Sequence, residues 1–128
     1  VMYRSEATSV EGFIQQLAVS YLGSGYWFYV VGEVPEGKDP RRVDEKLVAR
    51  YEIDLSKWAR ARRKRAGLAN LQYLRLGRLF VLLATHGNHP FFEWEAASVR
   101  DARKTPIRFR GYSISYRGGA SPRPHRPR

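Results

Sequence analysis

The densest group of chemically active side chains is a basic segment in the middle of the chain. Six cationic side chains fall within nine residues: Lys57, Arg60, Arg62, Arg63, Lys64 and Arg65. Like charges three or four residues apart repel each other on a helix, and the release of counterions on phosphate binding offsets that repulsion. We therefore expect this segment to contact a phosphate backbone, most directly through Arg62, Arg63 and Arg65, with the ring of Trp58 packed beneath the helix. The alternative is a solvated helix face with acidic neighbours.

A second group lies near the C-terminus, where cationic and aromatic side chains alternate. On a single strand over 106–116, side chains two residues apart share a face. The residues of one such face are Arg108, Arg110, Tyr112 and Tyr116. They would offer aromatic platforms for bases between anchors for phosphates, although the outer face of an ordinary antiparallel sheet has a similar composition. Arg117 and Arg123, in the tail that follows, would add contacts to a nucleic-acid backbone.

Two histidines, His86 and His89, follow the most apolar segment of the chain. They could serve as general acid and base in a small nuclease or strand-transfer enzyme, with Tyr73 or Tyr112 as the nucleophile. The simpler alternative is a turn, because the glycine and asparagine between them are turn residues. A metal site needs further ligands, and His125 in the tail is a poor third one. We therefore expect neither a metal nor a cofactor.

The distribution of charge points to a polyanionic partner. The 128 residues carry a formal net charge of +11. Residues 1–55 have 6 basic and 9 acidic side chains, whereas residues 56–128 have 17 basic and 3 acidic ones. If the first half folds back on the second, it neutralises only part of that charge. We expect nucleic acid as the partner, with RNA or single-stranded DNA favoured over duplex because exposed aromatics suit unpaired bases. A basic structural subunit of a ribonucleoprotein assembly, with a protein partner, is a further alternative.

Composition excludes several other classes of protein. The absence of cysteine rules out a disulfide scaffold, a Cys-ligated metal site and thiol catalysis. The longest apolar run, over 79–84, is far shorter than the roughly 20 residues that span a membrane. The N-terminus lacks the apolar stretch of a signal peptide, so we expect a cytoplasmic protein without a membrane partner. No phosphate-binding glycine loop, nucleophile elbow or dinucleotide fingerprint is present.

Hydrophobic periodicity predicts the elements that would position these residues. They are a helix over 9–22, a strand over 26–34, helices over 40–52 and 55–66, hairpin strands over 71–76 and 79–85, and strands over 91–95 and 106–116. This order predicts an α+β fold with a mostly antiparallel sheet of about five strands and two to three helices packed on one face. We expect one nucleic-acid-binding domain over residues 1–116 and a basic, disordered, flexible tail over 117–128.

Local signals predict where these elements begin and turn. Thr8 and Glu11 have the spacing of a capping box, so Thr8 is the expected start of the first helix. Asp54 is the expected N-cap of the basic helix, and Gly77 the expected turn of the hairpin. In the strand over 91–95, the alternation predicts that Trp94 faces the core.

Overall fold

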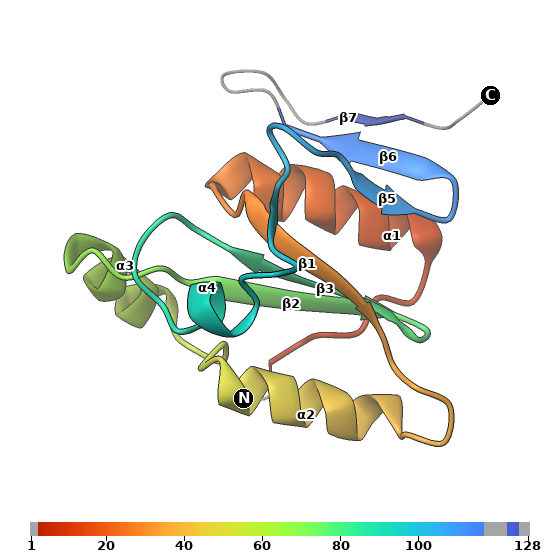
Figure 1. The fold of residues 1–128 in the computed structure, drawn as a ribbon, viewed down its shortest axis with the longest axis horizontal. Helices are drawn as coiled ribbons and strands as arrows, with labels where there is room; N and C mark the ends of the chain where they lie inside the picture. Colours follow the sequence, from red (N-terminus) through yellow and green to blue (C-terminus); the bar gives the residue numbers. More distant parts are fainter. Residues whose placement is uncertain (1–2, 117–122, 126–128) are drawn as a thin grey trace.

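The computed structural model describes residues 3–116 and 123–125, and shows an α+β fold built on a four-stranded antiparallel sheet (Figure 1). Its strands are β1 (Phe28–Glu33), β2 (Leu71–Leu76), β3 (Leu79–Ala84) and β4 (Arg100–Asp101). They lie in the order β2-β3-β1-β4. The predicted fold class is confirmed. The single sheet of about five strands is wrong, because the C-terminal strands form a sheet of their own.

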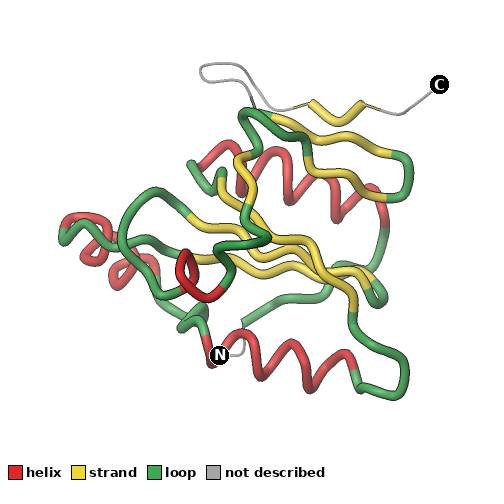
Figure 2. The backbone as a smooth tube through the Cα atoms, in the orientation of Figure 1, coloured by secondary structure: helices red, strands yellow, loops and turns green. Residues whose placement is uncertain are grey.

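Helices cover both faces of the sheet, and not one face as predicted. They are α1 (Val10–Gln15) with its π-helical continuation η1 (Gln16–Tyr21) and 3₁₀ turn η2 (Leu22–Ser24), α2 (Pro40–Arg50), α3 (Lys57–Arg65) and α4 (Phe91–Trp94). In the view of Figure 2, α1 lies above the sheet and α2 below it. The strands are apolar on both faces, so a face left open would expose a large apolar area to water.

Each face of the sheet has its own apolar core. On the side of α1, the buried side chains include Phe13, Leu17, Leu74, Leu83 and Ile107. On the side of α2, they include Val30, Tyr51, Tyr73, Leu82 and Phe91. Neighbouring residues of β2 and β3 belong to opposite cores, as the two-residue period of a strand requires. The sheet is therefore the middle of three layers.

The predicted hairpin and the central position of β1 are confirmed. Leu76 of β2 pairs with Leu79 of β3 across a turn in which Gly77 has a φ of +61°. Strand β1 lies between β3 and β4. The first and third helices start one and two residues later than predicted: Ser9 caps α1 in place of Thr8, and Ser56 caps α3 in place of Asp54.

The predicted strand over 91–95 is wrong, because these residues form the short helix α4. The carbonyl oxygen of Pro90 accepts hydrogen bonds from the backbone N–H groups of Glu93 and Trp94, at 3.0 and 2.9 Å. A helix turns by about 100° per residue and does not alternate like a strand. Phe91 is accordingly the fully buried residue, whereas Trp94, predicted to face the core, is 49% exposed.

The predicted single strand over 106–116 is also wrong. The chain reverses at Arg110 and Gly111, whose φ angles are +42° and +82°, values of the left-handed turn region. The reversal produces a hairpin of β5 (Ile107–Phe109) and β6 (Tyr112–Ser115), and β7 (Arg123–His125) pairs with β6. The rest of the predicted tail, 117–122 and 126–128, lies outside the described residues.

No helix in the described part of the chain is both long enough and apolar enough to cross a membrane.

A buried ion pair joins α2 to the sheet. Arg75 of β2 is 2% exposed, and its Nε and Nη2 atoms donate to the two carboxylate oxygens of Asp44 at 2.7 and 2.8 Å. Its Nη1 donates to the carbonyl oxygen of Gly77 at 2.6 Å, and the Tyr73 hydroxyl donates to Asp44 at 2.6 Å. Glu6 lies 3.4 Å from the same guanidinium. The pair therefore connects α2, β2 and the N-terminal segment.

We predict that replacing Asp44 destabilises the fold far more than replacing its exposed neighbour. Asp44→Ala leaves the buried guanidinium without its main partner, a loss of about 3–5 kcal/mol, measured as the free energy of unfolding in urea. Asp44→Asn keeps the shape and allows the measurement if the alanine variant does not fold. Glu45→Ala on the same helix should change stability by no more than about 0.5 kcal/mol. Equal effects of the two alanine variants would contradict this role of Asp44.

Candidate nucleic-acid interface

Helix α3 carries the basic segment and lies at one end of the molecule, away from α1 and α2 (Figure 1). The Oγ atom of Ser56 accepts a hydrogen bond from the backbone N–H of Ala59 at 3.1 Å and so caps its start. Alanine, arginine and lysine favour helix between the caps. Gly67, with a φ of +79°, ends the segment and turns the chain toward β2.

Arg60 does not point to solvent but attaches α3 to the body of the protein. Its Nη1 donates to the carbonyl oxygen of Leu71 at 2.9 Å and to the hydroxyl of Tyr26 at 3.0 Å. Its Nη2 donates to the carbonyl oxygen of Ile53, and its Nε lies 3.4 Å from that of Leu55. Two of these four acceptors lie in the segment before α3, one is at the start of β2, and one is on Tyr26, two residues before β1. Arg60 is therefore an anchor, and its predicted phosphate contact finds no support in this geometry.

Arg63 is turned the same way, because it lies one helical turn after Arg60. Its Nη2 donates to the carbonyl oxygen of Ala69 at 2.8 Å, and its Nε donates to Oδ1 of Asn70 at 3.1 Å. The Nδ2 of Asn70 in turn donates to the carbonyl oxygen of Arg60 at 3.0 Å. The sequence predicted a direct phosphate contact for Arg63, but this guanidinium is directed at the chain that follows the helix.

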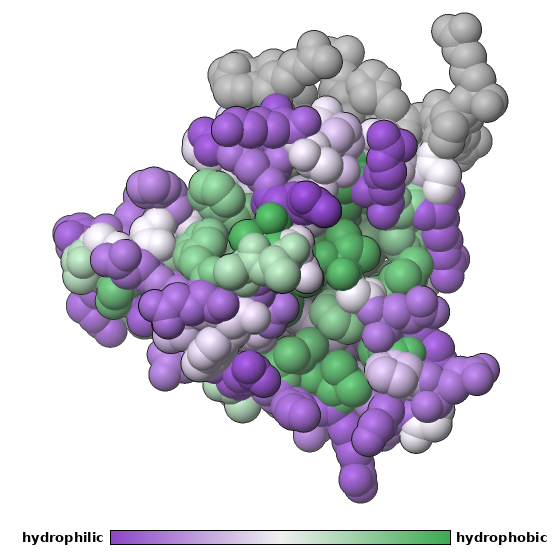
Figure 3. Space-filling model, viewed as in Figure 1, coloured by the Kyte–Doolittle hydropathy of each residue, from purple (hydrophilic) through white to green (hydrophobic). Residues whose placement is uncertain are grey.

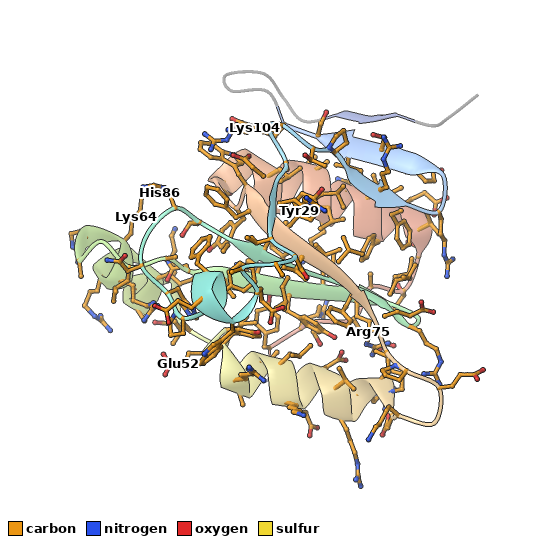
Figure 4. The ribbon with its side chains drawn as sticks, viewed as in Figure 1. Tyr29, Glu52, Lys64, Arg75, His86 and Lys104 are labelled. Atoms are coloured by element: carbon orange, nitrogen blue, oxygen red, sulfur yellow. The ribbon has the colours of Figure 1, made fainter. Side chains whose placement is uncertain are left out.

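The other four cations of α3 are exposed: Lys57, Arg62, Lys64 and Arg65. Within the described residues, none of them forms an ion pair or a side-chain hydrogen bond. Figure 4 labels Lys64 on α3, and Figure 3 shows mainly hydrophilic side chains at this end. The helix therefore presents four unneutralised charges to solvent.

The acidic first half of the chain does not neutralise this helix. Where described residues of the two halves form an ion pair, the partners are Glu6 or Asp44 on one side and Arg75 on the other. Arg75 lies near the end of β2, whereas α3 leads into its start at Leu71. Among the described residues, no acidic side chain therefore forms an ion pair with the exposed cations of α3.

Acidic side chains instead gather around a separate groove of about 870 Å³ between α2 and the N-terminal segment. The charged residues of its lining are Arg4, Glu6, Arg41, Asp44, Glu45, Glu52 and Asp54. Carboxylates outnumber guanidinium groups there, so this groove does not suit a polyanion.

The C-terminal hairpin does not present the predicted face of alternating cations and aromatics. Arg108 pairs with Ser113, and Phe109 pairs with Tyr112. Directly paired residues share a face, so Tyr112 lies on the same face as the buried Phe109 and opposite to Arg108. Tyr112 is half-buried against the core on the side of α1. The prediction that these four residues share one face is wrong, because the chain reverses at Arg110. Arg110 itself is exposed at the turn.

Tyr116 also packs against the protein. Its ring stacks on Trp27, with centroids 5.4 Å apart and an interplanar angle of 23°. The guanidinium of Arg103 lies 4.3 Å from the centroid of the same indole. Of the two predicted tail residues, Arg117 lies outside the described residues, and Arg123 is described only as part of the backbone of β7. Tyr112 and Tyr116 therefore both pack against other side chains of the protein.

The loop with the two histidines is joined to the end of α3. The backbone N–H of Asn88 donates to the carbonyl oxygen of Gly67, and that of Ala69 donates to Asn88, both at 3.0 Å. A Cβ atom on Gly87 would lie 2.7 Å from the backbone nitrogen of Ala69. Only glycine allows this close approach of the two chain segments.

Both ring nitrogens of His89 are already engaged. Its Nδ1 accepts a hydrogen bond from the backbone N–H of Phe91 at 3.0 Å, so Nε2 carries the proton and donates to the carbonyl oxygen of Tyr51 at 3.2 Å. Burial lowers the pKa of His89, which keeps the ring neutral. His89 holds the start of α4 in place, whereas His86 is exposed beside the ring of Phe28.

The expected catalytic partners are likewise absent from this loop. Tyr73 is fully buried on the sheet, and burial together with its hydrogen bond to Asp44 raises the pKa of its hydroxyl. A buried phenol held in its neutral form is a poor nucleophile. Among the residues that the structure describes, no three histidine, aspartate or glutamate side chains gather in a way that could hold a metal.

Trp58 lies on the outer face of α3. It is 77% exposed, although it was expected beneath the helix. On a helix, residues four and seven positions apart lie on one face, so Trp58 shares its face with Arg62 and Arg65. Burying its ring would also have buried those two guanidinium groups. This spacing was the available signal, and it favours Arg60 and Arg63 as the inner face.

Comparison of the chain with protein-family models, with curated proteins and with solved structures finds no match. The function must therefore be inferred from the charges and contacts of the chain itself.

We predict that Arg60 and Arg62 differ sharply in their effect on stability. Arg60→Gln removes hydrogen bonds from several partly buried carbonyl groups, a loss of about 1–3 kcal/mol in the free energy of unfolding. Arg62→Gln is the matched exposed control on the same helix and should stay within about 0.5 kcal/mol. Both are measured by urea unfolding. A larger effect of Arg62→Gln would contradict the assignment of inner and outer faces.

We also predict a pH dependence of stability that originates at His89. Its pKa in the folded protein lies below the ordinary imidazole value, so the unfolded chain takes up a proton first as the pH falls. The free energy of unfolding should therefore decrease between about pH 7 and pH 5. His89→Gln should flatten that slope. Unfolding in urea at the two pH values gives both slopes; an unchanged slope in His89→Gln would refute the effect.

Proposed function

We propose that this protein binds nucleic acid, gripping phosphates with the outer face of α3. The observation that carries the proposal is the set of exposed cations on one helix without an acidic partner among the described residues, Lys57, Arg62, Lys64 and Arg65. Keeping such charges close together is unfavourable in the isolated protein. A phosphate backbone offsets the repulsion by releasing its counterions.

Two other partners fit this surface less well. An anionic membrane binds helices that have a large apolar face beside the basic one, but the inner face of α3 is occupied by Arg60 and Arg63, which bind the body of the protein. An acidic protein scaffold, as in a ribonucleoprotein subunit, would have to place several carboxylates along one short helix. A nucleic-acid strand supplies that regular series of charges in every sequence.

A nuclease activity is not part of the proposal. It was based on His86 and His89 as acid and base, and the hydrogen bonds of His89 leave neither ring nitrogen available for proton transfer. His86 by itself is one exposed imidazole next to Phe28. Among the described residues, His86 and His89 therefore do not form an acid–base pair.

We predict that the double substitution Arg62→Glu/Arg65→Glu weakens binding by roughly tenfold or more at low salt and reduces its salt dependence. Each lost phosphate contact on a single strand should lower the slope of log K against log salt by about 0.7. Binding is measured by the fluorescence anisotropy of a labelled oligonucleotide at several salt concentrations. Circular dichroism confirms that the variant remains folded.

The matched control is Arg41→Glu/Arg42→Glu on α2. Both residues are exposed, and the change in net charge is the same. Acidic residues are also tolerated in the first turn of a helix. If both double variants lose the same affinity, the interaction reflects net charge and α3 is not the interface. Wild-type protein that binds no oligonucleotide at low salt refutes the proposal itself.

A further inference from the structure

The feature that the phosphate contacts leave unexplained is the exposed indole of Trp58. Four large apolar side chains of the described residues are exposed, and Trp58 is the most exposed of them, at 77%. The values for the others are 59% for Val19, 49% for Trp94 and 41% for Val31. Leaving an indole in water forgoes the stabilisation that its burial would supply. Trp94 has the guanidinium of Arg50 at 4.7 Å from its centroid. Trp58 makes no ring or cation–π contact with any of the residues that the structure describes.

The neighbours of this indole on the helix are Arg62 and Arg65, two of the cations proposed to bind phosphates. A helix turns by about 100° per residue, so Trp58, Arg62 and Arg65 form one ridge along α3. Arg60 and Arg63 lie on the opposite side, where they bind Leu71 and Ala69. The ridge is therefore held outward by the anchors of the helix, and its aromatic ring stands at one end of a row of positive charges.

We infer that Trp58 is a stacking platform for an unpaired base, so that the protein prefers single-stranded nucleic acid over duplex. The inference depends on the proposed function and specifies the strand that the same surface binds. A base in a duplex has both faces covered by its neighbours, whereas an unpaired base can place one face on an aromatic ring. Adjacent phosphates then reach the guanidinium groups of Arg62 and Arg65. Because every base has a π-face, this mode of binding requires no particular sequence.

The charges around the ring favour a nucleic acid over a protein as the occupant. Trp and Arg are also common at the centres of protein interfaces, but there the buried cations need carboxylates from the partner. Arg62 and Arg65 share the face of this aromatic side chain, Lys57 and Lys64 are exposed on the same helix, and none of the four forms an ion pair with a described residue. Alternation of a π-face with phosphates is a property of single strands.

The test compares two ligands that have the same number of phosphates. One is an oligodeoxythymidylate, and the other is a chain of equal length in which all residues are abasic. Wild-type protein should bind the first roughly 5- to 150-fold more tightly, the range found for stacking of one base on an aromatic residue. Trp58→Ala should lose that preference, and Trp58→Phe should retain part of it. None of these variants should alter binding to a duplex of the same length.

Trp94→Ala is the matched control, because Trp94 is the other exposed tryptophan and lies on α4. It should bind both ligands like the wild type. If wild-type protein binds the two ligands equally and Trp58→Ala changes nothing, the stacking inference is overturned while the phosphate grip of α3 stands. If wild-type protein binds neither ligand at low salt, the proposed function fails together with the inference. Anisotropy titrations with labelled forms of both ligands distinguish these outcomes.

Discussion

The arrangement of the layers depends on the buried guanidinium of Arg75 and the contacts that it makes. It binds Asp44 of α2 through two nitrogen atoms, approaches Glu6 of the N-terminal segment and donates to the β2–β3 turn at Gly77. A charge buried this deeply needs partners with good geometry, because its desolvation is costly. Two of the carboxylates of the acidic first half are thereby held at the end of β2. These two carboxylates pair with Arg75 near the end of β2, whereas α3 leads into its start.

Within α3, residues of one type have two separate tasks. Arg60 and Arg63 donate to backbone and side-chain oxygens of the body, and they fix the rotation of the helix about its axis. This rotation turns Trp58, Arg62 and Arg65 to solvent. A guanidinium suits both tasks, since its several donors can satisfy carbonyl groups in one place and phosphates in another. The anchors therefore determine which surface a partner meets, although they do not contact it themselves.

The sequence-based predictions were correct for elements that depend on residues close together in the sequence, and wrong for elements that depend on contacts formed only in the fold. Local periodicity, caps and turn residues determine the helices α1, α2 and α3, the central strand β1 and the hairpin at Gly77. The sequence predicted all of these elements. The strand expected over 91–95 became a helix because the carbonyl oxygen of Pro90 and the ring of His89 hold its first turn. The last strand became a hairpin because Ile107, Phe109 and Ile114 all reach the same buried core, which one extended strand does not allow.

For the candidate site, the sequence by itself determined the composition: a strongly basic chain, an uneven distribution of charge and a cluster of cations on one helix. Only the tertiary structure decided which of these cations are free, because that depends on the acceptors that Arg60 and Arg63 meet from distant segments. The tertiary structure also decided which aromatic side chains are exposed. Tyr112 and Tyr116, expected on an open face, pack against the protein, whereas Trp58, expected beneath the helix, is exposed. Charge is a sum over residues and can be read along the chain, whereas exposure and hydrogen bonding are relations between residues that only folding brings together.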